Sequence, residues 1–184
     1  MSLFEVEIKL RLDDFLRKRF ELFFNKYSLL PIKEERMVDV YFNHPNRNFS
    51  ESDEVLRVRK TLDYVLLTYK GPRVKGRSKT REELEVHISD FDTIILILKR
   101  IGFNELIRIE KIRKTYVFNK FKICIDNVVN LGLFAEIEVA CNNKDEIKNI
   151  ENEMFQFLKT EISDDVEKYI EPKTYLELIL ERDE

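Results

Sequence analysis

FEVEIKLRL, residues 4–12, alternates strictly between apolar and charged side chains after its first residue. Successive side chains of a β-strand point to opposite faces, so this segment predicts a strand with one apolar face and one fully charged face. The charged positions are Glu5, Glu7, Lys9 and Arg11. An antiparallel sheet whose charged face lies in water shows the same alternation. The rest of the chain therefore decides where this charged face lies.

Seven further segments are predicted as strands, and most of them repeat the alternation. They are residues 39–43, 55–60, 65–70, 80–88, 109–118, 121–127 and 133–140. Their connections are mostly short, which favours antiparallel neighbours. Apolar residues at helical spacing predict four helices, over residues 14–26, 90–101, 143–160 and 173–182. Asp13 and Asp90 are the expected N-caps of the first two helices, and Gly102 is the expected stop of the second.

Charges of one sign are grouped along the polar faces of these strands. Five same-sign pairs occur two residues apart: Glu5–Glu7, Arg57–Arg59, Glu83–Glu85, Lys111–Arg113 and Glu136–Glu138. A solvated surface usually intersperses the two signs. Acids and bases nearly balance on these faces, as a shared interior requires, because unpaired buried charge is very unfavourable. We therefore expect an α+β fold, an eight-stranded antiparallel β-barrel tunnel with a charged lumen and helices packed outside. An open sheet with its charges in solvent remains the alternative.

Length and composition set limits on the class of protein. The 184 residues predict a single domain spanning residues 1–184, and a net charge of −3 gives no indication of nucleic acid binding. Two cysteines without paired spacing argue against a disulfide framework and a zinc site. No signal peptide opens the chain, and the longest apolar run, IILIL at 94–98, is too short to span a bilayer. We expect a cytoplasmic protein with no membrane partner.

Acidic and basic clusters side by side are typical of a site for a polyanion and a divalent metal. Carboxylates bind hard cations such as Mg²⁺ or Mn²⁺, and Arg and Lys bind phosphate oxygens. A triphosphate-bearing small molecule satisfies both requirements. The candidate phosphate-binding residues are Arg57, Arg59, Lys70, Arg81, Lys111 and Arg113. The candidate metal carboxylates are Glu5, Glu7, Asp126, Glu136 and Glu138.

Other residues carry weaker signals. GPRVKGRS at 71–78 has the glycine spacing of a P-loop, but Arg77 replaces the required lysine and the segment joins two predicted strands, so a hairpin loop is expected. Cys124 is expected to be an inert packing thiol. His87 is expected at the mouth of the tunnel, and His44 in a turn beside Pro45.

Several short motifs resemble one known family in their order along the chain. EVEIK at 5–9 resembles the E-x-E-x-K signature of the CYTH superfamily, also called the triphosphate tunnel metalloenzymes. The segment VYFNHPNRNFSESDEVLRVRK at 40–60 resembles its class IV adenylyl cyclase branch. The further matching motifs are LRVRK, LTYKG, R-x-E-x-E at 81–85, K-x-R-x-x-Y at 111–116, Asp126, E-x-E at 136–138 and TYLEL at 174–178.

The resemblance implies a tunnel that holds a triphosphate together with Mg²⁺ or Mn²⁺. It implies metal binding by the five carboxylates named above, and phosphate binding by Lys9 in addition to the six bases. Glu83 and Glu85 are expected to orient basic side chains, and Lys173 is the candidate for a basic residue that closes the tunnel from a C-terminal helix. A homodimer is common among similar proteins.

Two reactions suit such a tunnel. Hydrolysis of inorganic or nucleoside triphosphates needs a positioned water, with Glu5 or Glu7 as candidates to activate it and Lys70 to place it. Cyclisation of ATP to cyclic AMP and pyrophosphate needs an adenine pocket in addition. Because hydrolysis requires fewer specific contacts, a metal-dependent triphosphatase is the favoured interpretation and an adenylyl cyclase the alternative. A non-catalytic polyphosphate- or nucleotide-binding module is a third interpretation.

Overall fold

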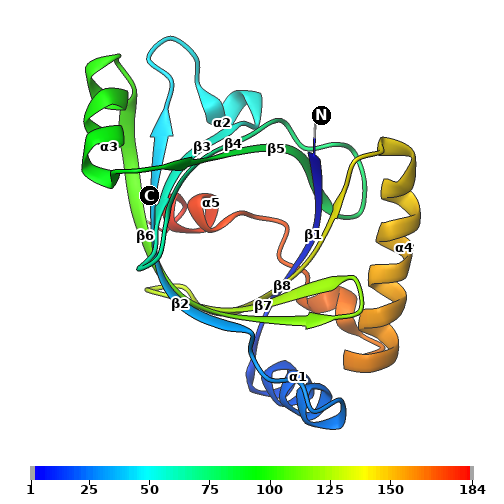
Figure 1. Cartoon of the computed structure of the whole chain (residues 1–184). Helices are drawn as coiled ribbons and strands as arrows, with labels where there is room; N and C mark the ends of the chain where they lie inside the picture. Colours follow the sequence, from blue (N-terminus) through cyan, green and yellow to red (C-terminus); the bar gives the residue numbers. More distant parts are fainter. Residues whose placement is uncertain (1–2, 183–184) are drawn as a thin grey trace.

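Eight antiparallel strands close into a barrel in the computed structural model, which describes residues 3–182 (Figure 1). The order around the barrel is β1-β5-β4-β3-β2-β6-β7-β8, and β8 pairs with β1 to close it. The strands are β1 (Leu3–Arg11), β2 (Lys33–Asn43), β3 (Val55–Lys60), β4 (Val65–Lys70), β5 (Lys79–Ile88), β6 (Asn104–Phe118), β7 (Phe121–Val128) and β8 (Gly132–Cys141). The predicted antiparallel barrel is confirmed.

The charged faces of the strands point into the barrel. Lys9 is 3% exposed, Arg113 5% and Asp126 0%, values that a solvated sheet face does not allow. The apolar face of β1 lies on the outside of the barrel, where Val6 and Ile8 are buried under helices. The closed barrel is therefore the correct alternative, and the open sheet is excluded for these strands.

The three longest helices pack on the outer surface of the barrel (Figure 1). They are α1 (Asp14–Lys26), α3 (Phe91–Arg100) and α4 (Ile147–Phe157). The predicted caps are confirmed, because the Asp13 carboxylate accepts the backbone N–H of Leu16 and the Asp90 carboxylate accepts that of Thr93, both at 2.7 Å. Gly102 follows α3 with a φ of +102°, a conformation that favours glycine.

The last helix, α5 (Tyr175–Leu180), has a different position. In Figure 1 it lies within the outline of the ring of strands, and its residues close one end of the barrel. Tyr175 and Leu178 pack there against lumen-facing apolar residues of β2, β6, β7 and β8, which we call the apolar floor. The strand residues of the apolar floor are Tyr41, Ile109, Val128 and Phe134. The barrel is thus closed at the end where α5 lies.

The structure differs from the sequence-based boundaries in several places. β2 and β6 begin at residues 33 and 104, earlier than the predicted 39 and 109. The predicted helix over 143–160 is divided into a 3-10 turn at 144–146, α4, and a π-helical turn at 158–162. A short helix, α2 (Phe49–Ser52), was not predicted. On the outer face of β5, Leu84 and Val86 remain 52% and 53% exposed, so the helices do not cover every apolar strand face. Within residues 3–182, none of the helices combines the length and apolar character needed to cross a membrane.

Candidate active site

A cavity of about 350 Å³ fills the lumen and is lined by residues from all eight strands. Its size is within the range of small-molecule sites, about 300–1,000 Å³. At its deep end lies Tyr175 of the apolar floor. At its other end lie more accessible residues such as Ile32, Lys33 and Glu85, which mark the mouth. The charged lumen is therefore a pocket entered from one end of the barrel.

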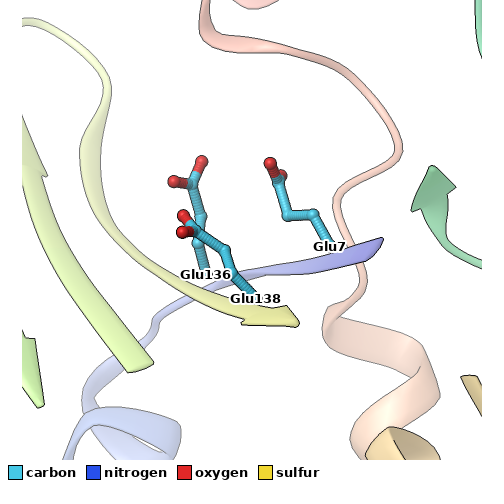
Figure 2. Close-up of side chains that lie close together, drawn as sticks. All are labelled: Glu7, Glu136 and Glu138. Atoms are coloured by element: carbon cyan, nitrogen blue, oxygen red, sulfur yellow. The ribbon is translucent and has the colours of Figure 1, made fainter. Parts of the chain in front are cut away.

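Three carboxylates meet on one side of this pocket. Glu7 on β1 pairs directly with Glu138 on β8, and Glu136 lies opposite Lys9 in the same ladder. One oxygen from each of Glu7, Glu136 and Glu138 lies within 4.8 Å of the others. Figure 2 shows the three side chains rising from the same face of the two paired strands. We call these three residues the carboxylate group.

Glu7 is the least compensated member of the carboxylate group. Its Oε1 is buried and accepts no hydrogen bond within residues 3–182; the nearest ammonium groups are those of Lys79 at 3.7 Å and Lys9 at 3.9 Å. Burial, followed by the charge of Glu136, raises the pKa of Glu7 above its usual value. A buried acceptor without a donor is unfavourable unless a ligand satisfies it. A hard divalent cation, which takes carboxylate oxygens, fits this arrangement.

Glu136 and Glu138 have cationic partners on the opposite side. Arg113 donates to both, with its Nη1 3.3 Å from Glu138. The Lys9 ammonium lies 3.2 Å from Glu136, and the Lys122 ammonium donates to Glu138 at 2.6 Å. Although burial opposes it, the charges of Arg113 and Lys9 hold the pKa of Glu136 well below its usual value. Glu136 is therefore ionised, as metal binding requires.

Arg57 and Arg59 project from β3 into the same lumen. Arg59 forms a bidentate pair with Asp39 on β2, with both nitrogen–oxygen distances at 2.7 Å. Burial of Asp39 acts to raise its pKa, but the charge of the Arg59 guanidinium outweighs this effect and lowers the pKa of Asp39 below its usual range. Arg57 donates to Thr68 at 3.1 Å, but its Nε is buried without a hydrogen-bond acceptor in the described part of the chain. An unpaired guanidinium N–H in a cavity is suited to an anionic oxygen.

Lys70 is held between two acids. Its ammonium donates to Glu5 at 2.7 Å and lies 3.1 Å from Glu83. Glu83 and Glu85 also approach Arg57, at 3.9 and 3.6 Å. Both acids thus lie beside basic side chains that line the lumen, and their orienting role stays a prediction. Glu5 is paired with Lys70 and does not join the carboxylate group.

Asp126 has a different environment from the one that its predicted role requires. It is fully buried and lies outside the carboxylate group. Its carboxylate accepts hydrogen bonds from Lys111 at 2.7 Å, Arg113 at 2.6 and 2.7 Å, and the Tyr175 hydroxyl at 3.0 Å. Four donors leave little capacity for a metal ion. The structure thus places Asp126 as the anchor of two basic residues.

Two predicted phosphate ligands are also engaged elsewhere. Arg81 lines the cavity, but its guanidinium donates to the Asp53 carboxylate at 2.9 Å and to the Gly71 carbonyl at 3.1 Å. Lys173 does not enter the lumen: its ammonium binds Glu181 at 2.6 Å near the surface. Residue 173 lies just before the N-cap Thr174, and from there the chain directs Tyr175, two residues later, into the barrel. The expectation that Lys173 closes the tunnel is wrong; the apolar floor closes it.

Lys79, Asp39 and Tyr175 are among the functional-site residues that were missed from the sequence. Lys79 lines the cavity, and burial together with the neighbouring Lys9 ammonium lowers its pKa to about 7. Lys79 lies on the same strand face as Arg81, two residues later. The predicted strand began at residue 80, and a strand beginning at residue 79 would have included Lys79 on its charged face. Asp39 likewise shares a face with Tyr41 on the predicted strand. Tyr175 is a helical residue, for which strand alternation gives no signal.

The remaining sequence signals have structural explanations. Residues 71–78 form the connection between β4 and β5, as expected. The loop N–H groups of Arg77 and Ser78 donate to the carboxylate of Glu151 on α4 at 2.9 and 2.8 Å. A carboxylate of the chain itself thus satisfies these two loop N–H groups. Cys124 is buried, which raises its pKa to about 12 and keeps the thiol protonated.

The two histidines lie where the sequence predicts them. His44 is in the turn that precedes α2, where its Nδ1 accepts the backbone N–H of Asn46 at 3.1 Å. His87 is exposed on β5, and its ring lies edge-on to that of Tyr64, a residue that lines the cavity. Neither histidine approaches the carboxylate group closely enough to join it.

Known proteins resemble this chain over nearly its whole length. A Methanocaldococcus jannaschii protein, MJ0240, named provisionally as an adenylate cyclase, is 41% identical over 95% of this chain and 97% of its own. The adenylate cyclase CyaB of Aeromonas hydrophila is 28% identical over 77% of this chain and 71% of its own. The solved structure of PH1819 from Pyrococcus horikoshii is 36% identical, covers 97% of this chain and 99% of its own, and superposes with a TM-score of 0.84.

The sequence also matches a family model. The model of the CYTH domain matches residues 3–172, which include all eight strands. The match agrees with the motifs found in the sequence and with the closed barrel that they predicted. This chain belongs to the CYTH domain family.

Proposed function

We propose that this protein is a divalent-metal-dependent triphosphatase that hydrolyses inorganic triphosphate, nucleoside triphosphates or both inside the barrel. The observation that carries the proposal is that an acid and a base in one cavity each have a buried atom without a hydrogen-bond partner. Among residues 3–182, Glu7 Oε1 lacks a donor and Arg57 Nε lacks an acceptor, although both are buried. A cation bound at the carboxylate group and a phosphate oxygen at Arg57 would satisfy the two groups together.

The metal ion would be held by Glu7, Glu136 and Glu138. When bound, Mg²⁺ or Mn²⁺ neutralises phosphate charge and lowers the pKa of a coordinated water. Arg57, Arg59, Lys70 and Lys111 line the opposite parts of the cavity and bind the phosphate oxygens. The paired acids Asp39, Glu83 and Asp126 fix the directions of these bases, so that little rearrangement is needed when substrate enters.

Hydrolysis adds one water to the triphosphate and gives a diphosphate and orthophosphate. The water must lose a proton, and Glu5 or Glu7 is the candidate acceptor. Lys70 is the candidate to position the water, while its contact with Glu5 keeps the ammonium in place. This reaction needs only triphosphate contacts, which the lumen supplies in excess.

An adenylyl cyclase is the second candidate, because the names of the Methanocaldococcus and Aeromonas relatives both describe adenylate cyclases. In that reaction the 3′-oxygen of ribose attacks the α-phosphorus and pyrophosphate leaves. The reaction requires the ribose and the adenine to be held in a fixed position beside the metal, in addition to the triphosphate contacts.

Product analysis separates the candidates. Purified protein is incubated with ATP or inorganic triphosphate and Mg²⁺ or Mn²⁺, with and without a chelator, and the products are resolved by anion-exchange chromatography. Metal-dependent release of orthophosphate supports the proposal. Formation of cyclic AMP and pyrophosphate would contradict the proposal and identify an adenylyl cyclase. Tight triphosphate binding without any product would indicate a binding module.

A further inference from the structure

A second cavity, of about 320 Å³, lies beside the lumen where the pairing of β1 with β5 ends. Its walls are β1, the loop before β5, and the segment before α5. Three residues, Glu7, Lys9 and Lys79, line both this cavity and the lumen. We call it the side pocket. Its other lining residues are Ile8, Arg73, Val74, Lys75, Gly76, Arg77, Ser78, Ile170, Glu171 and Pro172.

The barrel wall is interrupted at this point. The last paired residues of β1 and β5 are Glu7 and Lys79. Beyond them, the edge of β1 is taken over by residues 170 and 171: Ile170 bridges Leu10, and the Glu171 N–H donates to the Lys9 carbonyl at 2.8 Å. A continuous strand ladder therefore does not separate the lumen from the side pocket here.

Two ammonium groups and one carbonyl lie at this interruption. The Lys79 ammonium donates to the Lys173 carbonyl at 2.8 Å, and the Lys9 ammonium approaches the same oxygen at 3.5 Å. Both ammonium groups also lie within 4 Å of Glu7 in the carboxylate group. The boundary thus consists of side chains that rotate more readily than a hydrogen-bonded strand moves.

Basic residues outnumber acidic residues in the lining of the side pocket. Five of its lining residues are basic and two are acidic. Arg77 lies 3.8 Å over the Phe155 ring, and Arg73 is fixed by Asp53 and Glu177, so both are held in the wall. Lys75 is exposed near the tip of the loop. Lys9 and Lys79 thus line the side pocket next to the lumen, and Lys75 lines it from the loop. Ammonium groups around a pocket of this size suit a small inorganic anion.

We propose that the side pocket binds orthophosphate and is the route by which this product leaves the lumen, an inference that rests on the proposed triphosphatase function. The apolar floor closes the deep end of the lumen, so the mouth and the interruption of the barrel wall beside Glu7 are the exits that the described residues offer. Orthophosphate formed beside Glu7 then reaches the surface through the interruption, past Lys9 and Lys79 to Lys75.

Calorimetric titration tests the binding site. Orthophosphate is titrated into the full chain with the lumen filled by a non-hydrolysable triphosphate analogue and Mg²⁺. Wild type is expected to bind, and Lys75→Glu to bind about tenfold more weakly, since it loses a charge-assisted contact. Lys18→Glu, which makes the same charge change at an exposed position on α1, is expected to bind as wild type does. No binding by loaded wild type, or equal binding by Lys75→Glu, overturns the proposal.

Failure of the proposed function gives a different result. In that case the analogue itself does not bind, and the titration is made on the unloaded protein with Lys75→Glu and Arg59→Ala. Loss of orthophosphate binding in Lys75→Glu alone supports the side pocket, whereas loss in Arg59→Ala alone assigns the anion to the lumen and overturns it.

Release kinetics test the route. In the active enzyme, Lys75→Glu is expected to cleave substrate at the wild-type rate in a quenched single turnover and to release free orthophosphate several-fold more slowly. Cleavage and release that both match wild type show that the product leaves by the mouth.

Discussion

The Lys9 ammonium lies 3.7 Å from the centre of the Tyr175 ring, so that a residue near the start of the chain meets one near its end inside the barrel. The same tyrosine donates its hydroxyl proton to Asp126. Burial, and then the charges of Glu136 and Asp126, raises the pKa of Tyr175 well above its usual value, so the hydroxyl remains a donor. α5 therefore both closes the lumen and orients charged groups on β1 and β7.

Tyr175→Phe and Tyr175→Ala separate these two contributions. The phenylalanine variant keeps the ring beside Lys9 and loses one hydrogen bond, so its free energy of unfolding should fall by about 1 kcal/mol. The alanine variant also removes a buried ring, and the fall should be about 3–5 kcal/mol. Urea denaturation measures both values. Equal losses in the two variants would show that the ring contributes nothing at this position.

Glu7→Gln should reduce metal-dependent turnover by about 100-fold or more, because the amide is a poor metal ligand. The metal-free protein should nevertheless become more stable at pH 7. Because the pKa of Glu7 is higher in the folded protein than in the unfolded chain, Glu7 ionises more readily in the unfolded chain. As the pH rises above about 4.3, ionisation of Glu7 therefore lowers the free energy of unfolding.

Thermal unfolding in the presence of a chelator checks the stability part of this prediction. The gain in Tm should shrink as the pH is lowered towards 4. Glu82→Gln is the matched control, since residue 82 faces outward on β5 between the lumen-facing Arg81 and Glu83. If Glu7→Gln kept the wild-type turnover, Glu7 would not be a metal ligand.

Asp39→Asn should destabilise the protein by about 3–5 kcal/mol, because it leaves the buried Arg59 without its carboxylate. The effect depends on pH. The pKa of Asp39 is lowered in the fold, so its contribution is fully present above the unfolded value of about 3.9 and is lost progressively as the pH falls from there through the lower pKa of the folded state. Denaturation at pH 7 and pH 3 should therefore show a larger difference at pH 7. Asp164→Asn, at an exposed position, should show no such difference.

The sequence predicted the parts of the lumen that depend on local periodicity. Alternation places Glu7 and Glu136 on the charged faces of their strands, because side-chain direction within a strand follows from the period of two, and the grouping of like charges favoured an interior position for those faces. It does not say which carboxylates meet. Glu7 meets Glu138 because β1 pairs with β8, more than 120 residues later, whereas Asp126 faces Arg113 on β6. Register between distant strands is set by the closed barrel and not by local pattern.

The end of the chain was least predictable for a related reason. A helix of six residues has too few positions for its apolar stripe to show what it covers. Lys173 has the charge expected of a phosphate ligand, and Tyr175 does not, yet only Tyr175 enters the lumen. The N-cap at Thr174 sets this direction by fixing where the helix begins. Charge alone was therefore a misleading guide at this position.

Gly76→Ala should destabilise the protein by about 1–3 kcal/mol, because there is no room for a side chain beside Glu151. An added Cβ would lie 2.5 Å from Glu151 Oε1, the atom that accepts the N–H groups of Arg77 and Ser78. Gly71→Ala is the matched control in the same loop, since its Cβ would meet its nearest neighbour at an ordinary 3.8 Å. Urea denaturation of both variants measures the difference. If Gly76→Ala proved no less stable than Gly71→Ala, Glu151 would not hold this loop in the conformation that forms the wall of the side pocket.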